Sequence, residues 1–283
     1  PEPSGFSHPC HRGFSVTSNA RACFHPRFHC SSKSEAVTVI RSTMTKVALD
    51  RHIVALGGGG FSMEPGNPLL DSFVLSLTRK SRPRIGFLPT ASGDSNDYVA
   101  LFYRTFSAER YIPSHLPVFH GSFPDPSTWL NAQDVIYVGG GNTASMLAVW
   151  RVHGIDRALR QAWRAGIVLC GVSAGAMCWF NGGLTDSFGA GARPLHDGLG
   201  LLKGLFCPHY NNAERRKGLS DYVMRGELSS TYAVEDGCAL HFTGSRLTEA
   251  ISSRPQARAF RVQRQSERLI ESPLKVRFLG SAP

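Results

Sequence analysis

The sequence lacks any apolar run long enough to cross a membrane. A transmembrane helix needs about 20 consecutive apolar residues, and no run in these 283 residues approaches that length. The chain also lacks a dense cluster of lysine and arginine with interleaved aromatic residues, although its net charge is +10. Because its basic residues are spread out, the charge fits small acidic substrates as well as nucleic acid. We expect a soluble protein without a membrane or nucleic-acid partner.

A disulfide framework is also missing from the pattern of cysteines. The chain has seven cysteines, an odd number. Those of the main body are single and lie in apolar settings: Cys170, Cys178, Cys207 and Cys238. Such cysteines are typical of reduced thiols in a cytosolic protein. The sequence therefore predicts a cytoplasmic location.

The first 43 residues lack the patterning of a folded segment. Residues 1–42 are rich in serine, histidine, arginine and proline, contain only two acidic residues, and show no sustained helical or strand period. We interpret residues 1–43 as a disordered or non-native extension. A transit peptide and a zinc site built from the histidines and cysteines are the alternatives. Residues 44–283, which open on the plausible start Met44, are expected to form a single domain.

Short apolar runs alternate with helical patterns from residue 52 onward. Strands are predicted at residues 53–56, 85–88, 118–119, 135–138 and 167–170, with helices near 68–79, 96–109, 144–149 and 155–165. The apolar runs show little alternation, as expected for parallel strands that are covered on both faces. The pattern predicts an α/β fold, a three-layer α/β/α sandwich with a mainly parallel sheet. After residue 206 the pattern becomes mixed, with one helix and several short strands.

One motif stands out: residues 171–175 read Gly-Val-Ser-Ala-Gly between an apolar run and a helical segment. Strand, glycine-flanked serine and helix form the context of a nucleophile elbow, in which a tight turn presents the serine hydroxyl. The helix that follows would place its N-terminus beside a developing oxyanion. Ser173 is therefore the predicted nucleophile. The alternative is a tight turn whose serine only caps the helix.

A nucleophilic serine needs a base, and the base needs an orienting carboxylate. His209 follows Pro208 at the end of the apolar stretch 205–207, which places it at the carboxyl end of a predicted strand. Its alternative role is that of a histidine hydrogen-bonded at a strand end. The carboxylate candidates are Asp186 and, in the turn after residues 232–234, Glu235 with Asp236. Each of these acids is also typical of a turn.

Two glycine clusters follow predicted strands. Residues 139–143 read Gly-Gly-Gly-Asn-Thr before a helix, and the free backbone N–H groups of such a turn can bind a phosphate or an oxyanion. Residues 57–60 are four glycines that match neither a dinucleotide fingerprint nor a phosphate-binding loop. We interpret this second cluster as a tight exit from its strand.

With residues 139–143, 171–176 and Pro208-His209 in this order, the chain resembles the peptidase E family over about residues 52–262. This resemblance implies serine peptidases on a class I glutamine amidotransferase-like fold. It implies that Ser173 is the nucleophile and His209 the base. Oxyanion donors would come from Gly140 and Gly141 and from Ala174. No metal or cofactor is expected.

The resemblance leaves the third triad member open between two acids. Peptidase E proper has an aspartate a short way past the serine, which matches Asp186. Cyanophycinase-like relatives have a glutamate well beyond the histidine, which matches Glu235. The resemblance also implies a preference for dipeptides with an N-terminal aspartate, held by an arginine in the helix after the histidine. Asn142, Arg215 and Arg216 are the predicted substrate-binding residues, because a guanidinium can hold a carboxylate through two parallel hydrogen bonds.

Several other functions remain as alternatives. A cyanophycinase-like peptidase would act on an acidic polymer. An α/β-hydrolase esterase shares the glycine-serine motif, but its histidine usually lies near the C-terminus. A non-enzymatic module could bind a small ligand with the two glycine clusters. A glutamine amidotransferase would need cysteine in place of Ser173. The resemblance also implies a homodimer, and a small peptide is the expected substrate.

Overall fold

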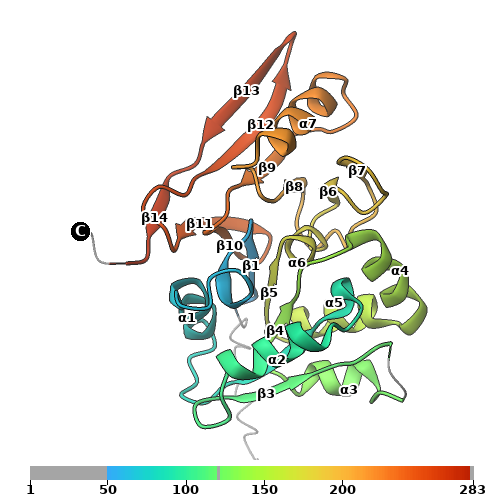
Figure 1. Ribbon diagram of the computed structural model, residues 1–283, viewed down its shortest axis with the longest axis vertical. Helices are drawn as coiled ribbons and strands as arrows, with labels where there is room; N and C mark the ends of the chain where they lie inside the picture. The colour runs from blue at the N-terminus through green and yellow to red at the C-terminus, as the bar shows by residue number, and fades with distance from the viewer. Residues whose placement is uncertain (1–49, 120–121, 281–283) are drawn as a thin grey trace, which may run out of the picture. The chain divides into compact units, whose positions relative to one another are not determined.

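The computed structural model describes residues 50–119 and 122–280. The predicted N-terminal extension, with its transit-peptide and zinc alternatives, lies outside these residues. The described residues all belong to one compact unit, Val47–Pro283. Figure 1 shows its elements. The unit contains two sheets, one of eight strands and one of six.

The larger sheet has eight strands in the order β14-β11-β10-β1-β5-β4-β2-β3. Five strands between residues 52 and 172 pair in parallel: β1 (His52–Leu56), β2 (Arg84–Leu88), β3 (Ile112–His115), β4 (Val135–Val138) and β5 (Val168–Val172). Three strands from the second half extend the other edge: β10 (Cys238–Thr243), β11 (Arg246–Ser252) and β14 (Val276–Phe278). Strand β10 runs antiparallel to β1. The mainly parallel character of this sheet agrees with the sequence prediction.

Helices cover both faces of the larger sheet. Alternate residues of β1 show this: Val54 packs with α1 (Leu69–Ser76) and α2 (Asn96–Thr105), whereas Ile53 packs on the opposite side. The opposite layer consists of α3 (Pro126–Asn131), α4 (Thr143–His153), α5 (Ile155–Arg164) and the short α6 (Ala174–Met177). The predicted three-layer α/β/α fold is confirmed. Two 3-10 turns, Gly60–Ser62 and Thr90–Ser92, follow β1 and β2.

One predicted strand is wrong. Residues 118–119 are irregular, and the third strand is β3, a few residues earlier. The backbone N–H groups of Val118 and Phe119 both donate to the carboxylate of Asp94. These donors are therefore satisfied by a side chain instead of by a neighbouring strand.

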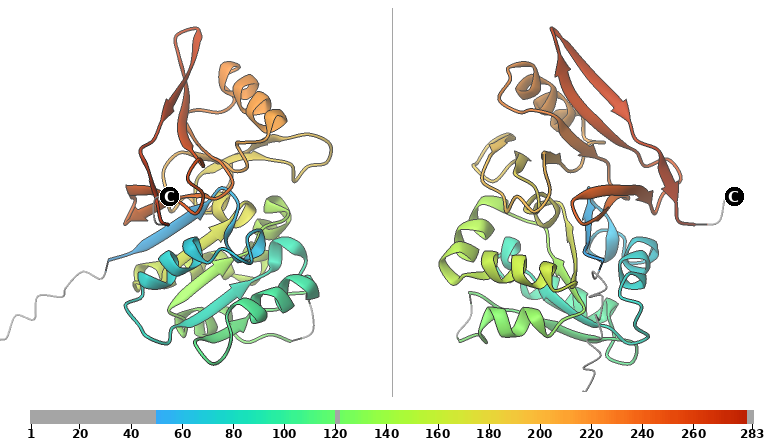
Figure 2. Two further views of the ribbon diagram at one scale, coloured as in Figure 1. Left: turned by 60° about the vertical axis from the view of Figure 1, so that its left-hand side comes forward. Right: turned by 180° about the vertical axis from the view of Figure 1, so that it is seen from behind.

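The second sheet has six strands in the order β13-β12-β9-β8-β6-β7. Its strands are β6 (Gly182–Thr185), β7 (Arg193–Leu195), β8 (Leu205–Cys207), β9 (Thr231–Val234), β12 (Ala259–Gln265) and β13 (Arg268–Pro273). Helix α7 (Ala213–Met224) packs on this sheet through Leu219 and Val223. The β12–β13 hairpin projects beyond the rest of the molecule in each view (Figure 1, Figure 2).

The two sheets meet where strands from both of them end. The backbone N–H of His209, after β8, donates to the carbonyl of Gly57, after β1, at 3.1 Å. The N–H of Gly237, after β9, donates to the carbonyl of Gly58 at 3.0 Å. Strand β5 of the larger sheet ends immediately before Ser173. Residues of both sheets are thereby brought to one edge, the edge at which α/β proteins build their sites.

Candidate active site

Ser173 lies in a strained turn between β5 and α6. Its φ is 55° and its ψ is −111°, a combination that is costly for a residue with a side chain. The flanking glycines make the turn sterically feasible. A Cβ at Gly171 would lie 2.1 Å from the carbonyl oxygen of Gly175, and one at Gly175 would lie 2.3 Å from that of Val138. The local geometry is therefore that of the predicted nucleophile elbow.

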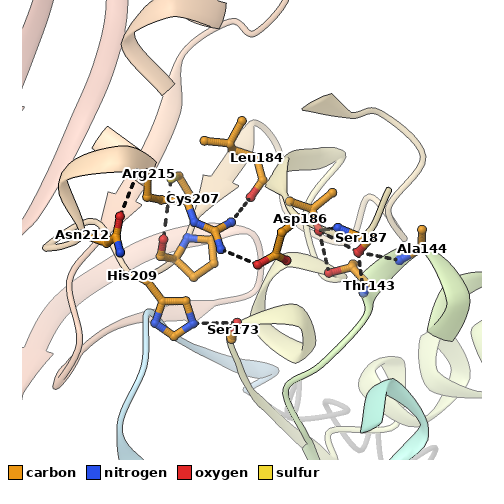
Figure 3. Close-up of polar contacts among 12 residues, drawn as sticks. Thr143, Ala144, Ser173, Leu184, Asp186, Ser187, Cys207, His209, Asn212 and Arg215 are labelled. Carbon is orange, nitrogen blue, oxygen red and sulfur yellow. Dashed lines mark hydrogen bonds and ion pairs between the residues drawn. The ribbon is translucent and has the colours of Figure 1, made fainter. Parts of the chain in front are cut away.

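His209 contacts the serine hydroxyl from the other sheet. Its Nε2 lies 2.9 Å from Ser173 Oγ (Figure 3). His209 also has a positive φ, 54°, and its backbone N–H is fixed by the carbonyl of Gly57. Two strained residues thus face each other across the junction of the sheets. This arrangement lets an imidazole accept the proton of a serine hydroxyl.

The carboxylate that contacts His209 belongs to Asp236. Its Oδ1 lies 2.6 Å from His209 Nδ1, and its Oδ2 accepts a hydrogen bond from Asn211 Nδ2 at 3.0 Å. Burial disfavours the charged form of Asp236. The hydrogen bonds from His209 and Asn211, together with the electrostatic attraction of His209 and Arg254, outweigh it and hold the pKa of this carboxyl below its usual value. Asp236 is therefore ionised where it can orient an imidazole and stabilise its charged form.

Glu235, one of the two predicted orienting acids, does not contact His209. Its Oε2 accepts the backbone N–H of Arg258 at 2.9 Å, and its Oε1 lies 3.3 Å from the Arg258 guanidinium and 3.7 Å from that of Arg216. These contacts hold the buried side chain away from the histidine. Glu235 and Asp236 are consecutive in an extended-to-turn segment, so their side chains point to different sides. The structure thus places Asp236, the next residue, against His209 in place of the predicted Glu235.

Asp186, the other predicted orienting acid, is also elsewhere. It pairs with Arg215, whose Nη2 lies 3.0 Å from Asp186 Oδ2, while Nη1 donates to the carbonyl of Leu184 at 3.1 Å (Figure 3). The side chain of Asp186 is 63% exposed and that of Arg215 is 13% exposed. The position of Asp186 makes it a partner of an arginine and excludes it from the hydrogen-bond chain of Ser173 and His209.

The glycine cluster at residues 57–60 has a second role, which the sequence analysis missed. A Cβ at Gly58 would lie 1.9 Å from Asp236 Oδ1 and 3.0 Å from His209 Nδ1. Any side chain there would occupy the space in which these two residues meet. The cluster is a tight strand exit, as predicted, and it also leaves room for the His209–Asp236 contact. A signal was present in the sequence, because only glycine permits such a close approach.

The three predicted oxyanion donors differ in their hydrogen bonding. The N–H of Gly140 donates to the hydroxyl of Tyr98 at 3.3 Å. The N–H groups of Gly141 and Ala174 have no acceptor among the described residues. Gly140 and Gly141 both line the pocket that contains Ser173, and Gly141 has a φ of 137°. Gly141 and Ala174 are thus better placed than Gly140 to bind an oxyanion.

The predicted substrate-binding residues also divide into two groups. Asn142 caps helix α4, since its Oδ1 accepts the N–H of Ser145 and its Nδ2 donates to the carbonyl of Ser187. Arg216 stacks on Tyr210 and pairs with Glu271. Both side chains are thereby committed to structural contacts. Only Arg215 of the three lines a pocket together with His209.

Two pockets flank the Ser173–His209 pair. One, of about 550 Å³, is lined by both residues together with Gly141 and residues of α2. The other, of about 490 Å³, is lined by His209, Asp186 and Arg215. A peptide bond placed at Ser173 would therefore find a cavity on either side.

No group of three or more histidine, cysteine or acidic side chains within residues 50–119 and 122–280 is arranged to hold a metal ion. In the same part of the chain, no helix is both long and apolar enough to span a bilayer.

Comparison with known proteins gives a family for this chain. The model of peptidase family S51 matches residues 53–250. The uncharacterized peptidase YgaJ of Bacillus subtilis is 46% identical over 231 residues, which cover 81% of this chain and 100% of that protein. Peptidase E of Shewanella amazonensis is 27% identical over 62% of this chain and 77% of that protein.

A solved structure agrees with the fold. The crystal structure of a peptidase from an acI-B1 Actinobacterium superposes with a TM-score of 0.58 at 17% identity, over 80% of this chain and 96% of that one. The elbow at Ser173, its contact with His209 and the family match over most of the described residues lead to one conclusion. The chain belongs to peptidase family S51 and is a serine-type peptidase of the peptidase E type.

Proposed function

We propose that Ser173, His209 and Asp236 form the catalytic triad of this peptidase. The observation that carries this assignment is the continuous hydrogen-bond chain from Ser173 Oγ through the imidazole to Asp236 Oδ1, with contacts of 2.9 and 2.6 Å. Ser173 attacks the scissile carbonyl while His209 Nε2 takes its proton. Asp236 holds the Nδ1–H tautomer and stabilises the imidazolium.

The N–H groups of Gly141 and Ala174 stabilise the oxyanion of the tetrahedral intermediate. Each such donor contributes about 3–4 kcal/mol to transition-state stabilisation in comparable sites. His209 then delivers its proton to the leaving amine. The imidazole next accepts a proton from water, and the resulting attack on the acyl-enzyme releases the product acid and restores Ser173.

The proposed substrates are small peptides with an N-terminal aspartate. Arg215 supplies the positive charge in the pocket beside His209, and its ion pair with Asp186 involves a carboxylate that is 63% exposed. An exposed ion pair is worth about 1 kcal/mol or less, so a substrate carboxylate can replace Asp186 on the guanidinium. The fork of Arg215 would then hold the aspartate side chain through two hydrogen bonds.

A second candidate substrate is an acidic, aspartate-containing polymer. Asp236 lies well beyond His209 in the chain, the position that the family resemblance gives to the orienting acid of cyanophycinase-like relatives. Hydrolysis of a soluble Asp-X dipeptide and of such a polymer, compared at equal enzyme concentration, separates the two candidates.

The nucleophile is tested with an Asp-Leu dipeptide and the Ser173→Ala variant. Removal of the nucleophile is expected to lower kcat by about 10⁴-fold or more. The matched control is Ser220→Ala, which removes a hydroxyl that only donates to the carbonyl of Arg216 in helix α7. Equal turnover by wild type and Ser173→Ala would refute the assignment.

A further inference from the structure

Helix α2 forms one wall of the pocket that contains Ser173. Four of its residues line that pocket. Besides Tyr98, these are Asp97, Leu101 and Arg104. They are spaced at i, i+4 and i+7, so they lie on one face of the helix. Ser173 and His209 line the same pocket. The helix thus presents an acid, an apolar residue and a base in sequence along the cavity above the nucleophile.

The two charged residues have no partners of their own. Asp97 and Arg104 make no ion pair and no side-chain hydrogen bond with any described residue, and both are exposed. The helix dipole favours an acid in the first turn and a base in the last turn, by about 1 kcal/mol or less each. That effect does not require either side chain to face the pocket. The negative charge of Asp97 is therefore available to a positive group of a ligand, and the positive charge of Arg104 to a negative group.

The separation of these charges suits a short zwitterion. Seven helical residues span about 10.5 Å along the axis. In an extended dipeptide the ammonium and the carboxylate are separated by about 7 Å, and each further residue adds about 3.5 Å. Both side chains lean toward the helix N-terminus, and because the side chain of Arg104 is the longer one, its charge is displaced further and the span between the two charges is shortened. The pocket wall therefore matches two residues better than three or more.

We propose that α2 binds both ends of an unblocked dipeptide, with Asp97 at the N-terminal ammonium and Arg104 at the C-terminal carboxylate. Leu101 contacts the substrate between them. This inference rests on the proposed function, because it places the scissile bond over Ser173. It makes Asp97 and Arg104 specificity-determining residues, and it identifies the substrate class as peptides with both termini free.

The test measures binding to the Ser173→Ala protein, which does not depend on turnover. Calorimetry gives Kd for four ligands: Asp-Leu, N-acetyl-Asp-Leu, Asp-Leu amide and the doubly blocked peptide. We expect each block to weaken binding by about fivefold, the size of one partly exposed ion pair. Adding Arg104→Gln should abolish the penalty of the amide and keep that of the acetyl group. Adding Asp97→Asn should do the reverse.

The matched control is Arg164→Gln, which removes an exposed arginine from the last turn of α5, on the opposite face of the sheet. It should leave all four Kd values unchanged. If Arg104→Gln weakens the free and amidated peptides equally, or if blocked and free peptides bind alike, the inference is overturned. If the wild-type protein failed to hydrolyse Asp-Leu, the proposed function would be refuted instead. The two failures are distinguishable, because the Kd values are measured without any turnover.

Discussion

Asp71 beside the larger sheet and Glu235 beside the smaller one are both buried acids, and they are held in opposite ways. Asp71, on helix α1 over the larger sheet, is 4% exposed, and its Oδ1 has no hydrogen-bond partner among the described residues. Burial raises the pKa of this carboxyl to about 7. In the smaller sheet, Glu235 and Glu271 both pair with Arg216, and Glu235 also pairs with Arg258.

The difference shows where an ionised orienting acid can be placed. The surroundings of Asp71 are apolar and favour the neutral form of its carboxyl. The junction with the smaller sheet supplies donors instead, and the pKa of Asp236 is lowered there. The larger sheet provides the strained turn for the nucleophile, and the smaller sheet provides the base and the charge that stabilises its protonated form.

Among the tests of this comparison between the sheets, the largest expected effect contrasts two neighbouring acids. Asp236→Asn should lower kcat by about 10³-fold, because an amide favours the wrong tautomer of His209 and cannot stabilise the imidazolium. Glu235→Gln should leave kcat within about threefold of wild type, although breaking its ion pairs should lower the midpoint of thermal unfolding. Steady-state kinetics at a temperature well below both unfolding midpoints measures the two effects.

The two variants together show which of the adjacent residues Glu235 and Asp236 orients His209. A near-normal kcat for Asp236→Asn would show that the hydrogen bond at 2.6 Å has no catalytic role. Asp186→Asn is the third member of the series, and we expect it to retain the kcat of wild type because Asp186 contacts Arg215 instead of His209.

The next effect concerns Asp71, the buried acid on helix α1. A folded-state pKa of about 7, against the ordinary value of 3.8, means that the folded protein binds a proton more tightly than the unfolded chain. This contribution to stability is complete below about pH 4 and is lost as the pH rises toward and through 7. Each pKa unit corresponds to about 1.4 kcal/mol, so the loss is at most a few kcal/mol.

Asp71→Asn removes the titration and should flatten this dependence. The difference in unfolding free energy between pH 5 and pH 8, measured by urea denaturation, should shrink relative to wild type. Asp221→Asn is the control, because its carboxylate lies on the surface of α7 and pairs only with Lys217. An unchanged pH dependence in Asp71→Asn would show that this acid is ionised in the folded protein.

The smallest expected effect is on stability, and it comes from comparing two tyrosines that lie beside the site. Tyr210, next to His209, donates its hydroxyl to Glu271 at 2.5 Å, and Tyr98 accepts the N–H of Gly140 at 3.3 Å. Hydrogen bonds to charged groups contribute about 1.5–3 kcal/mol and neutral ones about 1 kcal/mol. Tyr210→Phe should therefore lower the free energy of unfolding more than Tyr98→Phe. The reverse order in urea denaturation would contradict the importance of the charged contact.

The parts that could be predicted from sequence depend on local patterns. The parallel strands of the larger sheet are apolar runs between helical periods, and these signals lie within a few residues of each strand. The smaller sheet is not recognisable as a sheet in the sequence, although the stretch 205–207 is expected to be a strand and is β8. Its neighbour β7 has three residues and no apolar run, and a strand of that length carries too little periodicity to identify. Residues 118–119 were mistaken for a strand because Asp94 satisfies their backbone from a distant position.

By itself, the sequence determined the elbow at Ser173, because the tight turn requires glycine for steric reasons and both glycines lie two residues from the serine. It also brought His209 to the end of a strand. Tertiary structure decided which acid reaches that histidine. Glu235 and Asp236 are chemically similar and consecutive, so only the direction of the turn after β9 separates them. The space that Gly58 leaves beside Asp236 and the arginines that pair with Glu235 fix that direction.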